Sequence, residues 1–391
     1  MRQARWLAIG VFVCASLLNY LDRQLLPALQ PNLRTEFNIS YADFGSMLSV
    51  FSIIYALSAP FMGLLIDRVG LHWGITIALG SWSLTTIATG YTTGLTGILI
   101  CRAVLGVVQA GGVPCFGKAS AMYLQPGERA LGNSLSQIGI SLGGILAPLL
   151  AAWCVLHYGW RTAFVIGGSL GLVWLPIWWF TASRIAPLPV LPGERKVPLR
   201  ELLRDNRYWL FVAATMLGMT VYTLWSNWVT VYLTTWGLPA TVVNTRLAWI
   251  PPLLGALGGI CGGSLSLLLS RCGFTIHEAR IRACWVGAIG MLATATVPFM
   301  PNVATAAAAV AFSFFCATIF TVNLYSMPLE IFGRERAGIA IATLTSAYGL
   351  MQTFLSLGIG WVADHYGFPP VCIGIALLPL CAVVLLQKVR A

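Results

Sequence analysis

The sequence predicts an all-α polytopic membrane protein with twelve transmembrane helices in two pseudo-symmetric six-helix bundles. Three observations carry this prediction: an apolar composition, about a dozen long apolar runs, and an internal repeat. Of 391 residues, 58% are hydrophobic and only 9% are charged, whereas about 25% of a soluble chain is charged. A chain with so little charge must bury most of its surface in lipid.

Each apolar run is roughly 20 residues long, which is enough for one helix to cross a hydrocarbon core of about 30 Å. Helices are expected because a spanning helix satisfies its own backbone hydrogen bonds within lipid. The runs cover residues 6–29, 42–66, 73–91, 94–124, 130–157, 162–182, 208–235, 242–270, 283–301, 304–328, 337–363 and 368–388. The first run is too long for a signal peptide and contains Asp22-Arg23, so it is read as a permanent membrane helix.

The net charge of +11 reflects topology rather than nucleic-acid binding. Of the 23 Lys and Arg residues, 18 fall on the side of the N-terminus, three fall on the opposite side and two lie within segments. The positive-inside rule then places both termini in the cytoplasm. The ten cysteines show no CxxC spacing and are read as apolar packing residues, so no metal or cofactor is expected.

The two halves of the chain resemble each other. Glu128-Arg129-Ala130 recurs as Glu335-Arg336-Ala337, and His157-Tyr158-Gly159 recurs as His365-Tyr366-Gly367, at nearly constant spacing. Parallel six-helix repeats of this kind are typical of secondary transporters.

The duplication predicts three parts: a first bundle at 1–182, a cytoplasmic linker at 183–207 and a second bundle at 208–391. The linker carries four prolines and a run of mixed charges. Its end, 198–207, is either a short amphipathic helix on the inner leaflet or a simple basic connector.

The stretch Gly63-Leu-Leu-Ile-Asp67-Arg68-Val-Gly70 between the second and third segments resembles the cytoplasmic loop signature of the major facilitator superfamily. Its usual basic tail is replaced by Leu71-His72-Trp73. We assign Asp67 and Arg68 to gating, because a charged group at a helix end can cap or pair with a neighbouring helix.

The first half more specifically resembles the anion:cation symporter family, whose members carry sugar acids and other organic anions. The matching stretches include Asn19-Tyr20-Leu21-Asp22-Arg23, Arg102 to Pro114, and Gly159-Trp160-Arg161. The resemblance implies a glutamate seven residues after the arginine of the fourth segment, implicated in proton coupling. This sequence has Gln109 at that position.

Arg23 and Arg102 are the two arginines inside apolar segments. An arginine at membrane depth costs at least about 2.5–3.5 kcal/mol, so it is usually retained to bind something. Its planar fork suits carboxylates, which predicts an anion site. Pairing of Arg23 with Asp22, snorkelling, and bracing between helices by Arg102 are the alternatives.

Gln109 lies seven residues after Arg102, which places both on one helix face. An amide can hydrogen-bond but cannot titrate. We therefore expect weak proton coupling, or coupling through Asp22 alone. For Asp22 the alternative is a structural ion pair.

Uncharged polar and aromatic residues of other segments would supply selectivity. These candidates are Tyr55, Tyr222, Trp225, Asn323 and Ser346. Their alternatives are helix packing, an interfacial aromatic belt and hydrogen bonds between helices.

The sequence thus predicts a secondary transporter of a small organic anion, such as a hexuronate, galactonate or another carboxylate. Proton-linked symport is the expected mode, although Gln109 replaces the glutamate that the resemblance implies. A drug/proton antiporter of the same superfamily is the alternative. HExxH does not occur, and the two GxSxG matches, at 139–143 and 167–171, lie inside apolar runs rather than at a strand-to-helix turn, so an enzyme is not expected. The expected setting is a monomer spanning a bacterial inner membrane, without nucleic-acid partners.

Overall fold

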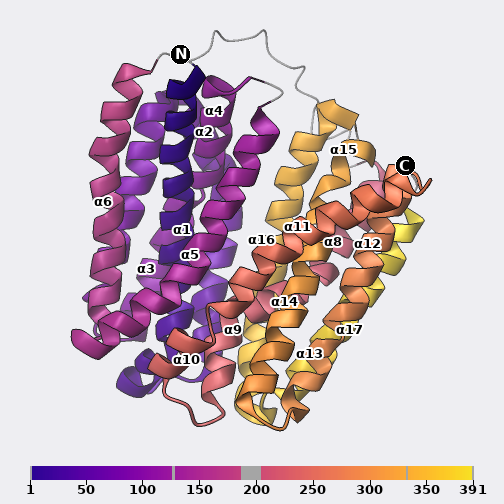
Figure 1. The fold of residues 1–391 in the computed structure, drawn as a ribbon. Helices are drawn as coiled ribbons and strands as arrows, with labels where there is room; N and C mark the ends of the chain where they lie inside the picture. The colour runs from indigo at the N-terminus through magenta and orange to yellow at the C-terminus, as the bar shows by residue number, and fades with distance from the viewer. Residues whose placement is uncertain (1, 126–127, 186–203, 332, 390–391) are drawn as a thin grey trace. The chain divides into compact units, whose positions relative to one another are not determined.

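A computed structural model describes residues 2–125, 128–185, 204–331 and 333–389 (Figure 1). Within these ranges every regular element is a helix, and ten helical spans are long and apolar enough to cross a membrane. All twelve predicted apolar runs fall on helices. The predicted linker, 183–207, and its amphipathic end lie mostly outside the described residues.

The described residues fall into two compact units. Unit 1 contains residues 2–125, 128–185 and 238–249, and unit 2 contains residues 204–237, 250–331 and 333–389. The main helices of unit 1 are α1 (Arg2–Phe37), α2 (Tyr41–Gly90), α3 (Leu95–Gln109), α4 (Gly112–Tyr123), α5 (Arg129–His157) and α6 (Trp160–Arg184). Helix α2 covers two predicted segments, which meet at Gly70, where the left-handed φ of 81° requires glycine.

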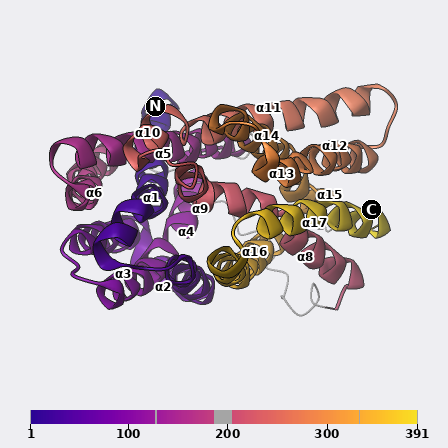
Figure 2. The ribbon, with the colours of Figure 1, turned by 90° about the horizontal axis from the view of Figure 1, so that it is seen from below.

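Unit 2 contains the second set of spans. Its elements are α8 (Asn206–Gly218), α9 (Thr220–Thr234), α11 (Ile250–Arg271), α12 (Ile276–Met291), α13 (Ala293–Thr296), η1 (Val297–Phe299), α14 (Val303–Ser326), α15 (Pro328–Ile331), α16 (Gly333–Tyr366) and α17 (Pro369–Lys388). Figure 2 shows the ribbon from below, with these helices labelled.

Helix α10 (Ala240–Arg246) lies between α9 and α11 in sequence but packs on α1 and α5 of unit 1. Asn244 is buried there, and its amide nitrogen donates to the Ala28 carbonyl at 2.8 Å. The predicted run 242–270 therefore comprises two helices that belong to different units.

Small residues allow the helices of unit 1 to pack closely. A Cβ atom on Gly139 would lie 2.6 Å from the Val13 carbonyl oxygen, and one on Gly143 would lie 2.5 Å from the Leu17 carbonyl oxygen. Both distances are shorter than van der Waals contact, so α5 can approach α1 this closely only with glycine. Glycine interfaces of this kind drive helix association in lipid, where the hydrophobic effect between helices is absent.

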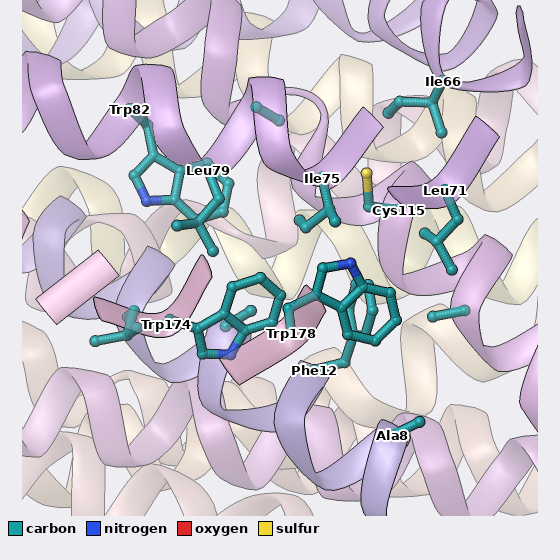
Figure 3. Packing of buried hydrophobic residues seen from close by; sticks show 14 of the residues in the cluster. Ala8, Phe12, Ile66, Leu71, Ile75, Leu79, Trp82, Cys115, Trp174 and Trp178 are labelled. Atoms are coloured by element: carbon teal, nitrogen blue, oxygen red, sulfur yellow. The ribbon is translucent and has the colours of Figure 1, made fainter. Parts of the chain in front are cut away.

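A cluster of buried aliphatic and aromatic side chains lies in the core of unit 1 (Figure 3). Phe12 of α1 meets Trp178 of α6 edge-on at 4.7 Å between ring centroids, and Trp174 stacks on Trp178 at 5.9 Å. Trp174 also donates from Nε1 to the Val11 carbonyl at 2.7 Å. These contacts pack α1 against α6.

The Trp160-Arg161 pair of the family signature joins three elements at one end of unit 1. Arg161 forms an ion pair with Glu36 of α1 at 2.7 Å, and Trp160 donates to the same carboxylate. Arg161 also donates to the Thr92 carbonyl between α2 and α3 at 3.4 Å. The signature at this position therefore has a structural explanation.

Candidate substrate site

Arg23 of α1 rests on two aromatic rings of α2. Its guanidinium carbon lies 4.6 Å from the Phe51 centroid and 5.0 Å from the Tyr55 centroid. Both distances are within the range of a cation–π interaction. The rings belong to residues one helical turn apart on α2, and their centroids are 5.7 Å apart.

Arg102 of α3 is 2% exposed. Among the described residues, its Nε and Nη2 atoms have no hydrogen-bond partner. It interacts electrostatically with both Asp22 and Arg23, which brings the charged groups of α1 and α3 into one region of unit 1. A buried charged group with unpaired donors is costly to a folded protein, so a ligand that supplies acceptors is the expected compensation.

Gln109 ends α3 and lies on the same buried face as Arg102. It is 1% exposed, and neither atom of its amide group is hydrogen-bonded to any described residue. The helix breaks directly afterwards, at Ala110 and Gly111, before α4 begins. The amide therefore offers one donor group and one acceptor to a ligand or to water.

Asp22 is 1% exposed and points towards α2 and α6. Thr86 of α2 lies beside it, and a Cβ atom on Gly167 of α6 would come within 2.8 Å of its Oδ1. Both carboxylate oxygens lack a hydrogen-bond partner in the described part of the chain. Arg23 makes its contacts with aromatic rings, and the fold has left this acid uncompensated by hydrogen bonds.

Two hydroxyl groups of α2, those of Ser83 and of Thr86 beside Asp22, are also unpartnered among the residues described. Their neighbours Thr85 and Thr89 on the same helix donate to backbone carbonyls four residues earlier. Such back-bonding is the usual solution within a membrane helix. The surroundings of Asp22 thus include polar groups that sequence reasoning missed, because their role depends on which face of α2 meets α1.

The gating candidates lie elsewhere in unit 1. Lys118 of α4 donates to the carbonyl of Ile66 at 2.9 Å and forms an ion pair with Asp67 at 3.2 Å. A cation at this position stabilises the end of a helix, where backbone carbonyls are unpaired. Arg68 is exposed. The lysine was not singled out in the sequence, since it lies 51 residues from its partner.

The candidates of unit 2 form a separate set on three helices. Tyr222 of α9 stacks on Phe314 at 5.0 Å, and buried Trp225 donates to the Thr294 hydroxyl at 3.1 Å. Asn323 of α14 donates to the Gly262 and Ile319 carbonyls, which leaves its buried Oδ1 without a partner in the described structure. Ser346 is half-buried on α16.

The Asn323 oxygen is thus the group of this set most available as an acceptor. The Trp225 indole already serves the packing of unit 2.

Residues 12–343 match the family whose description is Major Facilitator Superfamily. The chain belongs to the major facilitator superfamily. It is therefore a multi-span membrane transporter rather than an enzyme, as its sequence predicted.

Among curated proteins, the chain is 24% identical to the hexuronate transporter of Escherichia coli K12, over 98% of this chain and 94% of that protein. It is 25% identical to the galacturonate transporter of Dickeya chrysanthemi, over 68% of this chain and 83% of that protein. It is 24% identical to the D-galactonate transporter of Escherichia coli O6:H1, over 96% and 93% of the two chains.

Among solved structures, a bacterial homologue of the human lysosomal transporter Spinster, inward-facing and unoccupied, matches with a TM-score of 0.78. The match covers 99% of this chain and 95% of that chain at 18% identity. At this identity the likeness concerns the fold alone.

Proposed function

We propose that this transporter carries a small organic anion across a bacterial inner membrane by alternating access, and that its substrate is a sugar acid such as a hexuronate or galactonate. The observation that carries the proposal is the pair of arginines, Arg23 and Arg102, held in one region of unit 1 without hydrogen-bonded acids. The names of three relatives, which describe transporters of hexuronate, galacturonate and galactonate, support the same substrate class.

The chemistry of capture follows from these groups. With Asp22 ionised, the two arginines and this acid carry a net charge of +1, which suits one carboxylate. The guanidinium groups would donate to its oxygens in charge-assisted hydrogen bonds. Gln109 and Tyr55 would bind substrate hydroxyls. A neutral sugar would leave both cations without an acceptor.

Asp22 is the group we assign to proton coupling. It is a buried acid without hydrogen bonds from the residues described, so its charge is sensitive to the charges of Arg102 and of a bound anion. Gln109 cannot gain or lose a proton at any working pH. In this proposal, coupling passes through Asp22 alone and is weaker than in a site with a second acid. Asp67, Lys118 and Arg68 would stabilise one of the gating conformations, with both termini in the cytoplasm.

Uptake into proteoliposomes tests the proposal. Purified protein is reconstituted, and entry of labelled glucuronate, galacturonate and galactonate is compared with that of glucose, with and without an imposed pH gradient. We expect saturable uptake of at least one acid and none of glucose. Uptake of glucose or of a cationic drug, with no acid transported, would remove the proposed substrate class.

A further inference from the structure

We infer that Phe51 is a positioning residue: together with Tyr55 it forms an aromatic shelf that holds the Arg23 guanidinium in the orientation that receives a carboxylate. The inference rests on the proposed function, because it assumes that Arg23 binds the substrate. It adds a residue that neither the motifs nor the charge pattern of the sequence singled out.

The shelf lies against the guanidinium group. The guanidinium carbon is within 5.0 Å of both ring centroids, and Phe51 is 6% exposed. Arg23 Nε is buried and has no hydrogen-bond partner among the described residues. The two rings contact the guanidinium group, and its Nε donor remains for a ligand.

The position of the shelf relative to Arg102 is also fixed by helix packing. One turn after Arg102 on α3, a Cβ atom on Gly106 would lie 2.8 Å from the Phe51 carbonyl oxygen and 3.1 Å from the Tyr55 backbone nitrogen. The glycine thus allows α3 to contact the turn of α2 that carries both rings. The two arginines are held in register through this turn, although they belong to different helices.

Preorganisation explains why the shelf matters for binding. A free arginine side chain has many rotamers, and binding must pay the entropy of fixing one of them. A side chain already held by two rings loses less freedom when the anion arrives. Removing one ring should therefore weaken substrate binding more than it slows the transport cycle.

The experiment compares three variants in the uptake assay. Phe51→Leu keeps an apolar side chain but removes the ring, and Phe51→Tyr keeps the ring. Phe12→Leu is the matched control, because Phe12 is a phenylalanine of the same unit, 2% exposed, whose ring contacts are Phe116, Trp174 and Trp178 rather than a cation.

We expect Phe51→Leu to raise KM for the acid about fivefold, the scale of a partly desolvated cation–π contact. Vmax per folded protein should stay within about twofold. Phe51→Tyr should restore KM. Phe12→Leu should lower the apparent Tm at least as much as Phe51→Leu and leave KM unchanged.

A second measurement does not depend on how the leucine variant folds. Fluorinated phenylalanines incorporated at position 51 keep the ring's shape while withdrawing electron density from its face. Affinity should fall stepwise with the number of fluorines, because the attraction to the guanidinium depends on that density. An unchanged KM across the fluorinated series would overturn the inference.

The outcomes separate the two proposals. If the wild-type protein transports no organic acid, the proposed function fails. If the wild type transports an acid and all Phe51 variants keep its KM, only the positioning role fails. A KM increase of equal size in Phe12→Leu would show a general packing effect and would also count against the role.

Discussion

Replacing Arg102 with methionine should stabilise the empty transporter while removing its ability to bind an anion. The two effects have one cause: Arg102 is 2% exposed, and its Nε and Nη2 atoms lack hydrogen-bond partners in the described structure. Methionine has a comparable length and can fill irregular space in a helix interface. The substitution therefore removes the charge and its donors without opening a large cavity.

The magnitude follows from the unpaired donors. Each buried donor left unsatisfied costs roughly 1–3 kcal/mol. The attraction of Arg102 to Asp22 and its repulsion from Arg23 act in opposite directions. The cost of the unsatisfied Arg102 donors should therefore dominate. Because the substitution removes that cost, we expect the apparent Tm of the substrate-free protein to rise by about 3–6 °C. On the binding side, a lost charge-assisted hydrogen bond of roughly 1.5–3 kcal/mol corresponds to about a 10- to 150-fold weaker affinity.

Thermal unfolding of detergent-purified protein measures both effects in one experiment. The wild type should show a lower Tm without ligand and a rising Tm as the acid is added. The methionine variant should start higher and not respond to the acid. A lower starting Tm would mean that Arg102 braces helices, as one reading of the sequence allowed. A preserved response to the acid would remove Arg102 from the site.

Three further predictions follow from single contacts. Gln109→Glu should make acid uptake depend more steeply on an inward proton gradient, since it adds a titratable group to the site; an unchanged ratio of uptake with and without the gradient would contradict this. Gly143→Val should reduce the yield of folded protein, because a Cβ atom at this position would lie 2.5 Å from the Leu17 carbonyl oxygen. Gly117→Ala is the control that should be tolerated, because a Cβ atom there has no neighbour within 4 Å. Lys118→Met should slow transport with little change in substrate affinity, because it removes the 3.2 Å ion pair to Asp67; a selective loss of affinity would argue against a gating role.

The helical content and number of the membrane segments could be read from the sequence because length and apolarity are local properties. All twelve predicted runs fall on helices. The predicted break between 66 and 73 is confirmed, because the helical backbone angles are interrupted at Gly70. The subdivision of the run 242–270 was harder to predict: it divides at Leu247–Trp249 into α10 and α11. Such a division depends on packing against other helices.

The site shows the same limit. Arg23, Arg102, Gln109 and Asp22 stood out because polar groups within apolar runs are rare and costly. Phe51 could not stand out, because aromatic residues are common in membrane helices. Its contact with Arg23 depends on the relative rotation of α1 and α2.

The central claim is that Arg23 and Arg102 bind a negatively charged carboxylate, and the most direct test varies only that charge. Isothermal titration of purified protein with glucuronate and with its methyl ester compares ligands of nearly the same shape with and without the charge. The account predicts that the acid binds and that the ester binds at least about tenfold more weakly, with the difference lost in Arg102→Met. Equal affinities for acid and ester in the wild type would contradict it.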